Sequence, residues 1–259
     1  MSVWAIIPFI DLPEMTMQAA NDVLDQSVET RVLLIANDCT DETVRQMETF
    51  CKGSDRVLLW NHRPALPALG ATWNEGLRFC FGAGAEEVLV VNNDVRLHPR
   101  TVHLLGAALL GGGEEPPFFV SAVNAGGIAD PYEWDLSMKG GPDFSCFMVT
   151  REFFEKYPFD PELTYAGDLD THRRVLLAGD GDKMYSVNVP YHHLASQTLK
   201  QLPPEKAQIY HAQADAHRAY YARKWGGPVN LEKWRVPFSG EDEEGITTPE
   251  LFDAVRAKW

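Results

Sequence analysis

Four apolar runs in the first part of the chain alternate with helix-like segments, and this alternation limits the possible folds more than any other feature. The runs are "VWAIIPFI" (3–10), "TRVLLIAND" (30–38), "RVLLWNH" (56–62) and "EEVLVVNNDV" (86–95). Such runs are typical of strands buried inside a parallel sheet, where each strand needs a crossover helix to reach the next. The sequence therefore predicts an α/β fold with a mostly parallel central sheet flanked by helices.

The second half of the chain has a more mixed pattern. We expect strands at 117–125, 143–150 and 183–196, and helices at 151–163, 168–180 and 203–227. A length of 259 residues allows one large domain. We expect a single domain over 1–227, with halves at 1–100 and 101–227. A C-terminal acidic extension, 228–259, contains "SGEDEEG" and ends in a short helix.

Composition and charge exclude several classes of protein. No apolar run approaches the roughly 18 residues that a membrane-spanning helix needs, so we expect no integral membrane segment. The net charge of −14 disfavours broad binding to nucleic-acid backbones but suits a site that gathers divalent cations. The four cysteines lack CxxC spacing, which indicates free thiols and a cytoplasmic location.

The common phosphate-binding and nucleophile motifs are absent. The sequence contains no GxxxxGK[ST], no GxGxxG after its first strand and no GxSxG. What remains is a set of carboxylates, amides and histidines near the predicted carboxyl ends of strands, where open α/β sheets bind their ligands.

Asn92, Asn93 and Asp94 directly follow the fourth apolar run. Polar residues commonly end strands and start turns, which is one interpretation of this cluster. The other is that Asp94 and an amide oxygen bind Mg²⁺ or Mn²⁺, ions that prefer oxygen ligands and often retain substrate phosphates.

Three further clusters have both a structural and a functional interpretation. Asp168 and Asp170 either cap the helix that follows them or supply a general base. In "PYHHLAS", the histidines are either surface or core residues after a strand, or His192 or His193 binds the same metal; alternation along a strand allows only one of the two to face it. In "IANDCTDET", Asn37 or Asp38 could contact a nucleotide, while Thr40 or Asp41 caps a helix.

Taken in order, these clusters resemble a family 2-like glycosyltransferase of the Rossmann-like GT-A fold, over Val3 to about Trp225. "VWAIIPFID" resembles the opening strand beside the nucleotide, and "LLIANDCTDET" resembles the second strand. "ALGATWNEGLRFCFGAGAEEVLVVNNDVRLHP" resembles a helix followed by the Asp-x-Asp strand, here in an Asn-x-Asp form. "GPDFSCFMVTREFFEKYPFDPEL", "AGDLDTHRR", "VPYHH" and "AYYARKWGG" resemble the acceptor-side segments.

The resemblance implies a donor-binding half at 1–100 and an acceptor half at 101–227. It implies Asp168 as the general base of an inverting transfer, and a divalent metal, Mn²⁺ or Mg²⁺, held by Asp94, Asn92 and His192. Contacts to a nucleoside-diphosphate sugar, with UDP-glucose as the example, are expected from Pro8, Phe9, Ile10, Asn37, Asp38, Asn74, Asn92 and Asn93. The acceptor side is expected to use Phe144, Ser145, Asp170 and Arg173.

Two positions depart from the family pattern. Ala36 stands where the family has an aspartate near the base, so the identity of the base is left open. Gly167 replaces the glutamate of the usual Glu-Asp pair, which leaves Asp168 as its only carboxylate.

The acceptor remains open between a glycan, a small molecule and a hydroxymethylated base in phage DNA. Two other classes also remain: a non-catalytic nucleotide-sugar or glycan-binding module, and a nucleotidyltransferase.

Overall fold

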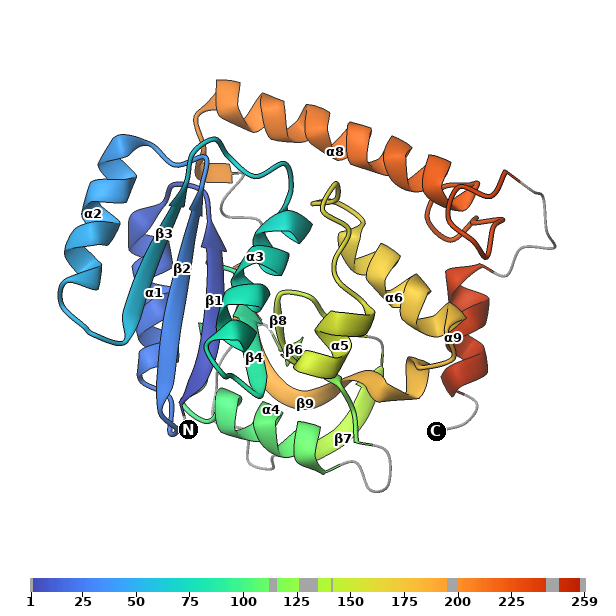
Figure 1. Ribbon diagram of the computed structural model, residues 1–259, viewed down its shortest axis with the longest axis horizontal. Coiled ribbons are helices and arrows are strands. Elements are labelled where there is room, and N and C mark those ends of the chain that lie inside the picture. Colours follow the sequence, from blue (N-terminus) through green and yellow to red (C-terminus); the bar gives the residue numbers. More distant parts are fainter. Residues whose placement is uncertain are drawn as a thin grey trace.

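The computed structural model of the chain describes residues 2–111, 116–125, 135–140, 142–194, 200–240 and 247–256. The described residues form a nine-stranded sheet with helices on both faces (Figure 1). Along the sheet the order is β3-β2-β1-β4-β8-β6-β9-β5, and β7 pairs with β9 outside this path.

The first half of the sheet is parallel, as the sequence predicts. Its strands are β1 (Val3–Phe9), β2 (Thr30–Asn37), β3 (Val57–His62) and β4 (Glu87–Val91). β1 pairs in parallel with both β2 and β4, and β2 pairs in parallel with β3. The carboxyl ends of these four strands therefore lie at one edge of the sheet.

Helices connect these strands and cover both faces of the sheet. They are α1 (Pro13–Leu24), α2 (Asp41–Cys51) and α3 (Leu69–Gly82), and α4 (Thr101–Leu110) follows later. Alternate residues of each strand face opposite cores. Ile7 and Leu34 belong to the core shared with α1, α2 and α4, whereas Ile6 and Leu33 belong to the core shared with α3.

The second half of the sheet is mixed. It contains β5 (Val95–Leu97), β6 (Phe119–Asn124), β7 (Asp135–Gly140), β8 (Cys146–Thr150) and β9 (Met184–His193). β8 pairs antiparallel with β4 and β6, while β9 is parallel to β6 and antiparallel to β5 and β7. The single strand expected over 86–95 is thus two strands, with Asn92–Asp94 between them, and β7 was not anticipated.

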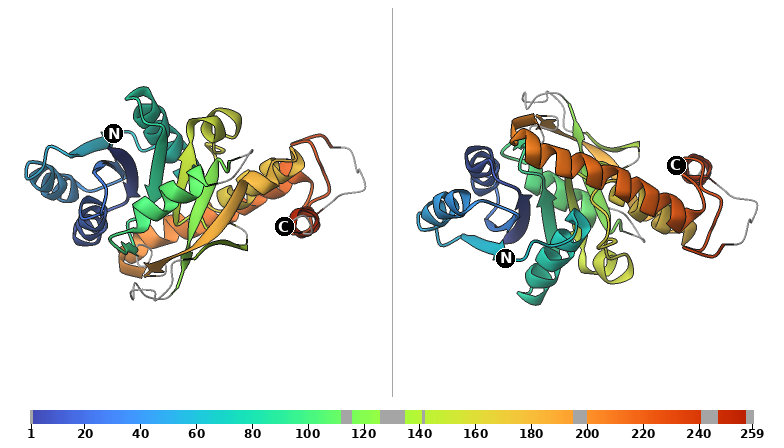
Figure 2. Two further views of the ribbon diagram at one scale, coloured as in Figure 1. Left: turned by 90° about the horizontal axis from the view of Figure 1, so that it is seen from below. Right: turned by 90° about the horizontal axis from the view of Figure 1, so that it is seen from above.

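The remaining elements belong to the second half of the chain. They are α5 (Arg151–Lys156), α6 (Gly167–Leu177), the short 3₁₀ helix η1 (Gly181–Lys183), α8 (Pro204–Trp225) and α9 (Thr248–Arg256). The helix α8 begins near the ends of β1 to β3 (Figure 1) and, seen from above, runs away from these strands and over α6 (Figure 2). It thus joins two regions that are distant in the sequence.

The described part of the C-terminal extension is attached to the domain through buried polar contacts. Glu232 accepts hydrogen bonds from the Tyr221 hydroxyl at 2.6 Å and the Thr248 hydroxyl at 2.9 Å. Arg173, which is fully buried, donates to the carbonyl oxygen of Trp234 at 2.8 Å. The acidic stretch 241–246 lies outside the described residues. None of the helices in the described ranges has the length and hydropathy needed to span a bilayer.

Candidate functional site

Two adjoining pockets open at the carboxyl ends of the strands. The strand-end pocket, about 330 Å³, is lined by Pro8, Phe9, Ile10, Asn37, Asp38, Ala65, Leu66, Pro67, Ala68, Leu69, Thr72, Asn92, Asn93, Asp94, Thr164, Tyr165, His193, Tyr210 and Gln213. The helix-α6 pocket, about 570 Å³, is lined by Leu69, Trp73, Asn92, Pro142, Asp143, Phe144, Ser145, Thr164, Tyr165, Ala166 and Asp168. Leu69, Asn92, Thr164 and Tyr165 line both, so the two pockets share a wall.

The strand-end pocket brings together most of the residues predicted to contact a donor. Pro8, Phe9 and Ile10 come from the end of β1, and Asn37 and Asp38 come from the end of β2. Asp38 has a positive φ of 64°, which turns the chain sharply as it leaves the strand.

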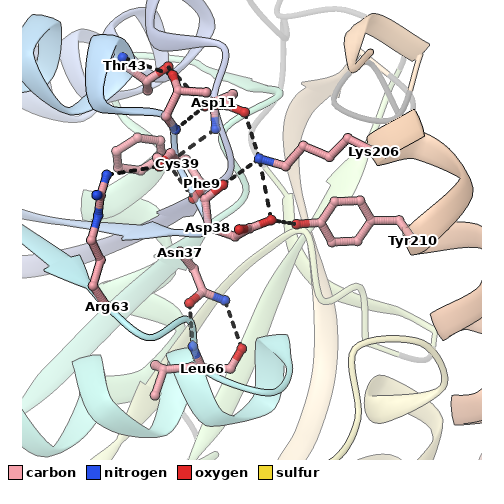
Figure 3. Close-up of polar contacts among 11 residues, drawn as sticks. Phe9, Asp11, Asn37, Asp38, Cys39, Thr43, Arg63, Leu66, Lys206 and Tyr210 are labelled. Atoms are coloured by element: carbon pink, nitrogen blue, oxygen red, sulfur yellow. Dashed lines mark hydrogen bonds and ion pairs between the residues drawn. The ribbon is translucent and has the colours of Figure 1, made fainter. Parts of the chain in front are cut away.

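The amide of Asn37 holds one wall of this pocket in place. Its Oδ1 accepts a hydrogen bond from the backbone N–H of Leu66 at 2.7 Å, and its Nδ2 donates to the Leu66 carbonyl at 3.2 Å (Figure 3). Because both polar atoms of the amide are engaged in this way, Asn37 shapes the pocket wall.

Asp94 and His193 meet at the other end of the strand-end pocket. Nε2 of His193 lies 3.2 Å from Oδ1 of Asp94, and Asp94 is only 5% exposed. The hydrogen bond to Asp94 raises the pKa of His193. In the β5–β9 pair His193 lies opposite Val95 and His192 lies opposite Arg96, so the two imidazoles point to opposite faces. The structure thus places His193 in the strand-end pocket, and not His192, the histidine chosen from the sequence.

The residues around Asp94 suit a divalent cation that arrives with phosphates. The strand-end pocket offers the Asp94 carboxylate, the His193 imidazole and the Asn92 amide, which are oxygen and nitrogen ligands that Mn²⁺ accepts. Among the described residues, no three His, Cys, Asp or Glu side chains gather closely enough to hold a metal by themselves. A cation here would draw its remaining ligands from a diphosphate and water, as Mg²⁺ commonly does.

Asp168 lies in the first turn of α6 and lines the helix-α6 pocket. Ala166, immediately before the helix, has a left-handed backbone with φ of 63°. The residue reaches solvent, but its carboxyl is crowded by protein atoms. This desolvation raises the pKa of Asp168, backbone N–H groups oppose the shift, and the charge of Asp143 adds to it.

Asp143 is a pocket residue that the sequence interpretation missed. It lines the helix-α6 pocket beside Phe144 and Ser145, which were predicted. Its carboxylate accepts hydrogen bonds from the Tyr191 hydroxyl and, at 2.8 Å, from the backbone N–H of Ser145. Its position directly before two predicted residues was the only signal available in the sequence.

Three predicted site residues have structural roles away from the pockets. Asn74 exchanges two hydrogen bonds with the backbone of Phe159, at 2.7 and 2.9 Å. Asp170 is fully buried and accepts from Trp225 Nε1 at 2.9 Å, and Arg173 holds the C-terminal extension. The prediction that these three contact substrate is therefore not supported by their placement.

Asn93 is placed at the site but is largely covered. It lines the strand-end pocket and is 6% exposed, and its amide donates to the Thr16 hydroxyl at 3.2 Å. Tyr210 and Gln213 on α8 line the same pocket and were not predicted. Their signal in the sequence was their spacing of three residues, which puts both on one face of a helix.

Comparisons with known proteins show what this fold is similar to. No family model matches the sequence, and no curated protein matches it. A mannosyltransferase from Pyrobaculum calidifontis, solved with GDP-mannose and Mn²⁺, is 15% identical with a TM-score of 0.57 and covers 83% of this chain. The chain spans 61% of that protein and 44% of a crystallised TarS chain from S. aureus.

Two further structures have similar scores. Residues 1–349 of TarS give 14% identity and a TM-score of 0.58, covering 87% of this chain and 74% of that one. The glucosyl-3-phosphoglycerate synthase of Mycobacterium tuberculosis, solved with Mn²⁺, UDP-glucose and glycerol 3-phosphate, gives 16% identity and a TM-score of 0.58, covering 92% of this chain and 88% of that one. These likenesses confirm the predicted GT-A fold.

Proposed function

We propose that this protein is a metal-dependent glycosyltransferase that moves a sugar from a nucleoside-diphosphate sugar to a hydroxyl group, with inversion at the anomeric carbon. The observation that carries the proposal is the shared wall between the two pockets, because it sets Asp94 and Asp168 in neighbouring chambers. A donor held in one chamber can then meet an acceptor held in the other.

The strand-end pocket is assigned to the donor. Asp94, His193 and Asn92 would hold the divalent cation, which when bound supplies positive charge that stabilises the departing diphosphate. Pro8, Phe9, Ile10, Asn37 and Asp38 form the walls at the β1 and β2 ends, where the nucleoside would lie.

The helix-α6 pocket is assigned to the acceptor, with Asp168 as general base. The acceptor oxygen forms a bond to the anomeric carbon, the bond from that carbon to the diphosphate oxygen breaks, and the hydroxyl proton passes to Asp168. Attack from the side opposite the leaving diphosphate inverts the configuration. The raised pKa of Asp168 makes its carboxylate a stronger base than an aspartate with the usual pKa.

The lining of the helix-α6 pocket favours an uncharged acceptor. Its described residues include two carboxylates, Asp143 and Asp168, and three aromatic residues, Trp73, Phe144 and Tyr165, but no lysine, arginine or histidine. Carboxylates repel phosphate groups, while aromatic faces pack well against the apolar faces of sugars. We therefore propose a glycan or small polyol acceptor in preference to a base in DNA.

The central experiment measures donor binding and transfer separately. UDP-glucose and GDP-mannose are titrated by calorimetry with and without Mn²⁺ into the wild-type protein, Asp94→Asn and Asp168→Asn. We expect Asp94→Asn to lose the Mn²⁺-dependent part of the affinity. Asp168→Asn should bind the donor normally but lose about 10³-fold in kcat, since positioned bases contribute factors of this size.

Two outcomes would contradict the proposal. Equal Mn²⁺-dependent affinity in the wild-type protein and Asp94→Asn would remove the metal role of Asp94. Donor binding without transfer to any acceptor and without donor hydrolysis would indicate a binding module instead.

The acceptor class is tested with the matched pair glycerol and glycerol 3-phosphate, and a preference for the phosphorylated compound would contradict an uncharged acceptor.

We also propose that the protein is located in the cytoplasm. All four cysteines are free, and two of them are buried. Free thiols are stable in a reducing compartment, which supports the cytoplasm.

A further inference from the structure

The inner side of α8 carries a stripe of polar side chains beside its buried residues Ala214, Tyr221 and Trp225. Residues three or four positions apart share a helix face. The stripe on α8 consists of Lys206, Tyr210, Gln213, His217, Tyr220 and Lys224. We call these six residues the α8 stripe. Five of the six, Lys206, Tyr210, His217, Tyr220 and Lys224, bind polar partners on the body of the domain, so specific contacts set the position of α8.

The two ends of the α8 stripe contact different halves of the chain. At one end, Lys206 Nζ lies 2.8 Å from Asp11 Oδ2 and 3.4 Å from Asp38 Oδ2, and it donates to the Asp38 carbonyl oxygen (Figure 3). At the other end, Lys224 Nζ lies 2.6 Å from both Asp160 and Asp170. Ion pairs therefore hold the helix at both ends, and its first half borders the strand-end pocket.

The middle of the α8 stripe forms part of the pocket itself. Tyr210 and Gln213 line the strand-end pocket, and the Tyr210 hydroxyl donates to Asp38 Oδ2 at 3.0 Å. His217 accepts hydrogen bonds from the backbone N–H groups of Thr164 and Tyr165, at 3.1 and 3.3 Å. These contacts place two side chains of α8 over the β2 end of the pocket.

The order of the strands indicates which part of a donor would lie there. Asp38 follows β2, Asp94 follows β4, and β1 lies between those strands. Two strand spacings correspond to roughly 10 Å. A donor whose diphosphate lies beside Asp94 therefore directs its ribose and base toward Asp38 and α8.

We propose that α8 is part of the donor site: Gln213 and Tyr210 contact the nucleoside, and Lys206 is a positioning residue that holds them in place. This inference rests on the proposed function. Lys206 also offsets two negative charges that would otherwise face a diphosphate-bearing ligand. Burial by itself would raise the pKa of Asp11, but the hydrogen bonds from Lys206 and Thr40 bring it below its usual value.

The test compares four variants with the wild-type protein. Lys206→Met removes the ion pair, Lys206→Arg keeps the charge and Gln213→Ala removes a proposed contact. Arg218→Met is the matched control, because Arg218 is on the same helix and forms an ion pair with the exposed Asp215. The measurements are the Kd of UDP and of GDP with Mn²⁺, the donor KM and kcat, and the thermal midpoint.

We expect Lys206→Met and Gln213→Ala to raise the Kd of the preferred nucleoside diphosphate and the donor KM about tenfold, with kcat within about twofold of wild type. Lys206→Arg should recover most of the affinity, and Arg218→Met should match the wild-type protein. A purely structural role would lower the thermal midpoint and leave these constants unchanged.

The role of α8 and the proposed function can be disproved separately. Unchanged Kd and KM in both Lys206→Met and Gln213→Ala, with wild-type binding intact, would overturn the role of α8 alone. A wild-type protein that binds neither UDP nor GDP with Mn²⁺ would overturn both proposals.

Discussion

Nε2 of His193 lies 3.2 Å from a carboxylate oxygen of Asp94, although the two residues are far apart in the sequence. The contact exists because β9 returns antiparallel beside β5, and their register sets His193 opposite Val95, the residue after Asp94. The same register turns His192 to the other face.

This contact predicts that His193 contributes to Mn²⁺-dependent donor binding and that the adjacent His192 does not. We expect His193→Gln to weaken Mn²⁺-dependent donor binding about tenfold, since one metal ligand is lost. His192→Gln is the matched control and should bind as the wild-type protein does. Calorimetry with and without Mn²⁺ measures both, and a larger loss in the His192 variant would contradict the assignment.

Asp143 should set the pH dependence of transfer through its charge. Burial is the main cause of the raised pKa of Asp168, and the charge of Asp143 adds a smaller increase, so Asp143→Asn should lower this pKa. A general base works only when deprotonated, and activity is lost as pH falls through its pKa. The acidic limb of the kcat/KM profile should therefore move to lower pH in Asp143→Asn. An unmoved or higher limb would show that Asp168 does not titrate in that profile.

Lys224 is expected to be important for folding. It is buried between Asp160 and Asp170, so Lys224→Met removes the cation of Asp160 and leaves Asp170 paired with Arg174. Removing one partner from such a buried pair costs about 3–5 kcal/mol of unfolding free energy. Denaturant titration measures this loss. Arg218→Met, whose ion pair is exposed, should change stability by less than about 1 kcal/mol.

His172 should make the folded protein sensitive to acid. Burial lowers the pKa of His172 to about 4. Between about pH 6.5 and 4 the unfolded chain binds a proton that the folded chain does not, so stability falls as the pH falls. We expect up to about 3 kcal/mol to be lost across this window in the wild-type protein and recovered in His172→Phe. Unfolding curves at pH 7 and pH 4.5 compare the two, and parallel losses would exclude His172 as the cause.

Two glycines of α3 should respond in opposite ways to alanine. A Cβ at Gly76 would lie 2.9 Å from side-chain atoms of Ile6 and Ile35, whereas a Cβ at Gly82 would meet nothing within 4 Å. Gly76→Ala should cost about 1–3 kcal/mol through overpacking. Gly82→Ala should stabilise by up to about 1 kcal/mol through helix propensity. Thermal unfolding of both variants tests the pair.

The parallel half of the fold was predictable because its signals are local. Each strand and helix of the first half is marked by its own apolar pattern, and β1 to β4 follow the expected order of chain segments. The division of 86–95 into β4 and β5 was missed because it depends on β8 and β9, which pair with those two segments from far along the chain.

The candidate site was predictable only in part, for a related reason. Asp94, Asp168, Asn37 and Asp38 stand at element ends, and such positions can be read from a linear pattern. Lys206 meets Asp11 across 195 positions of sequence, and no periodicity in either segment specifies that contact. Asn74 was predicted to contact the donor because its amide could bind a ligand. In the structure that amide instead exchanges hydrogen bonds with the backbone of Phe159, which the sequence pattern does not reveal.

Under the proposed function, the wall common to both pockets links donor binding and acceptor choice. Thr164 and Tyr165 border both chambers, and His217 on α8 fixes their backbone. A substitution that reshapes this wall to admit a different acceptor should also change the affinity for the proposed sugar-nucleotide donor. Acceptor range and donor affinity should therefore change together in any directed evolution of this protein.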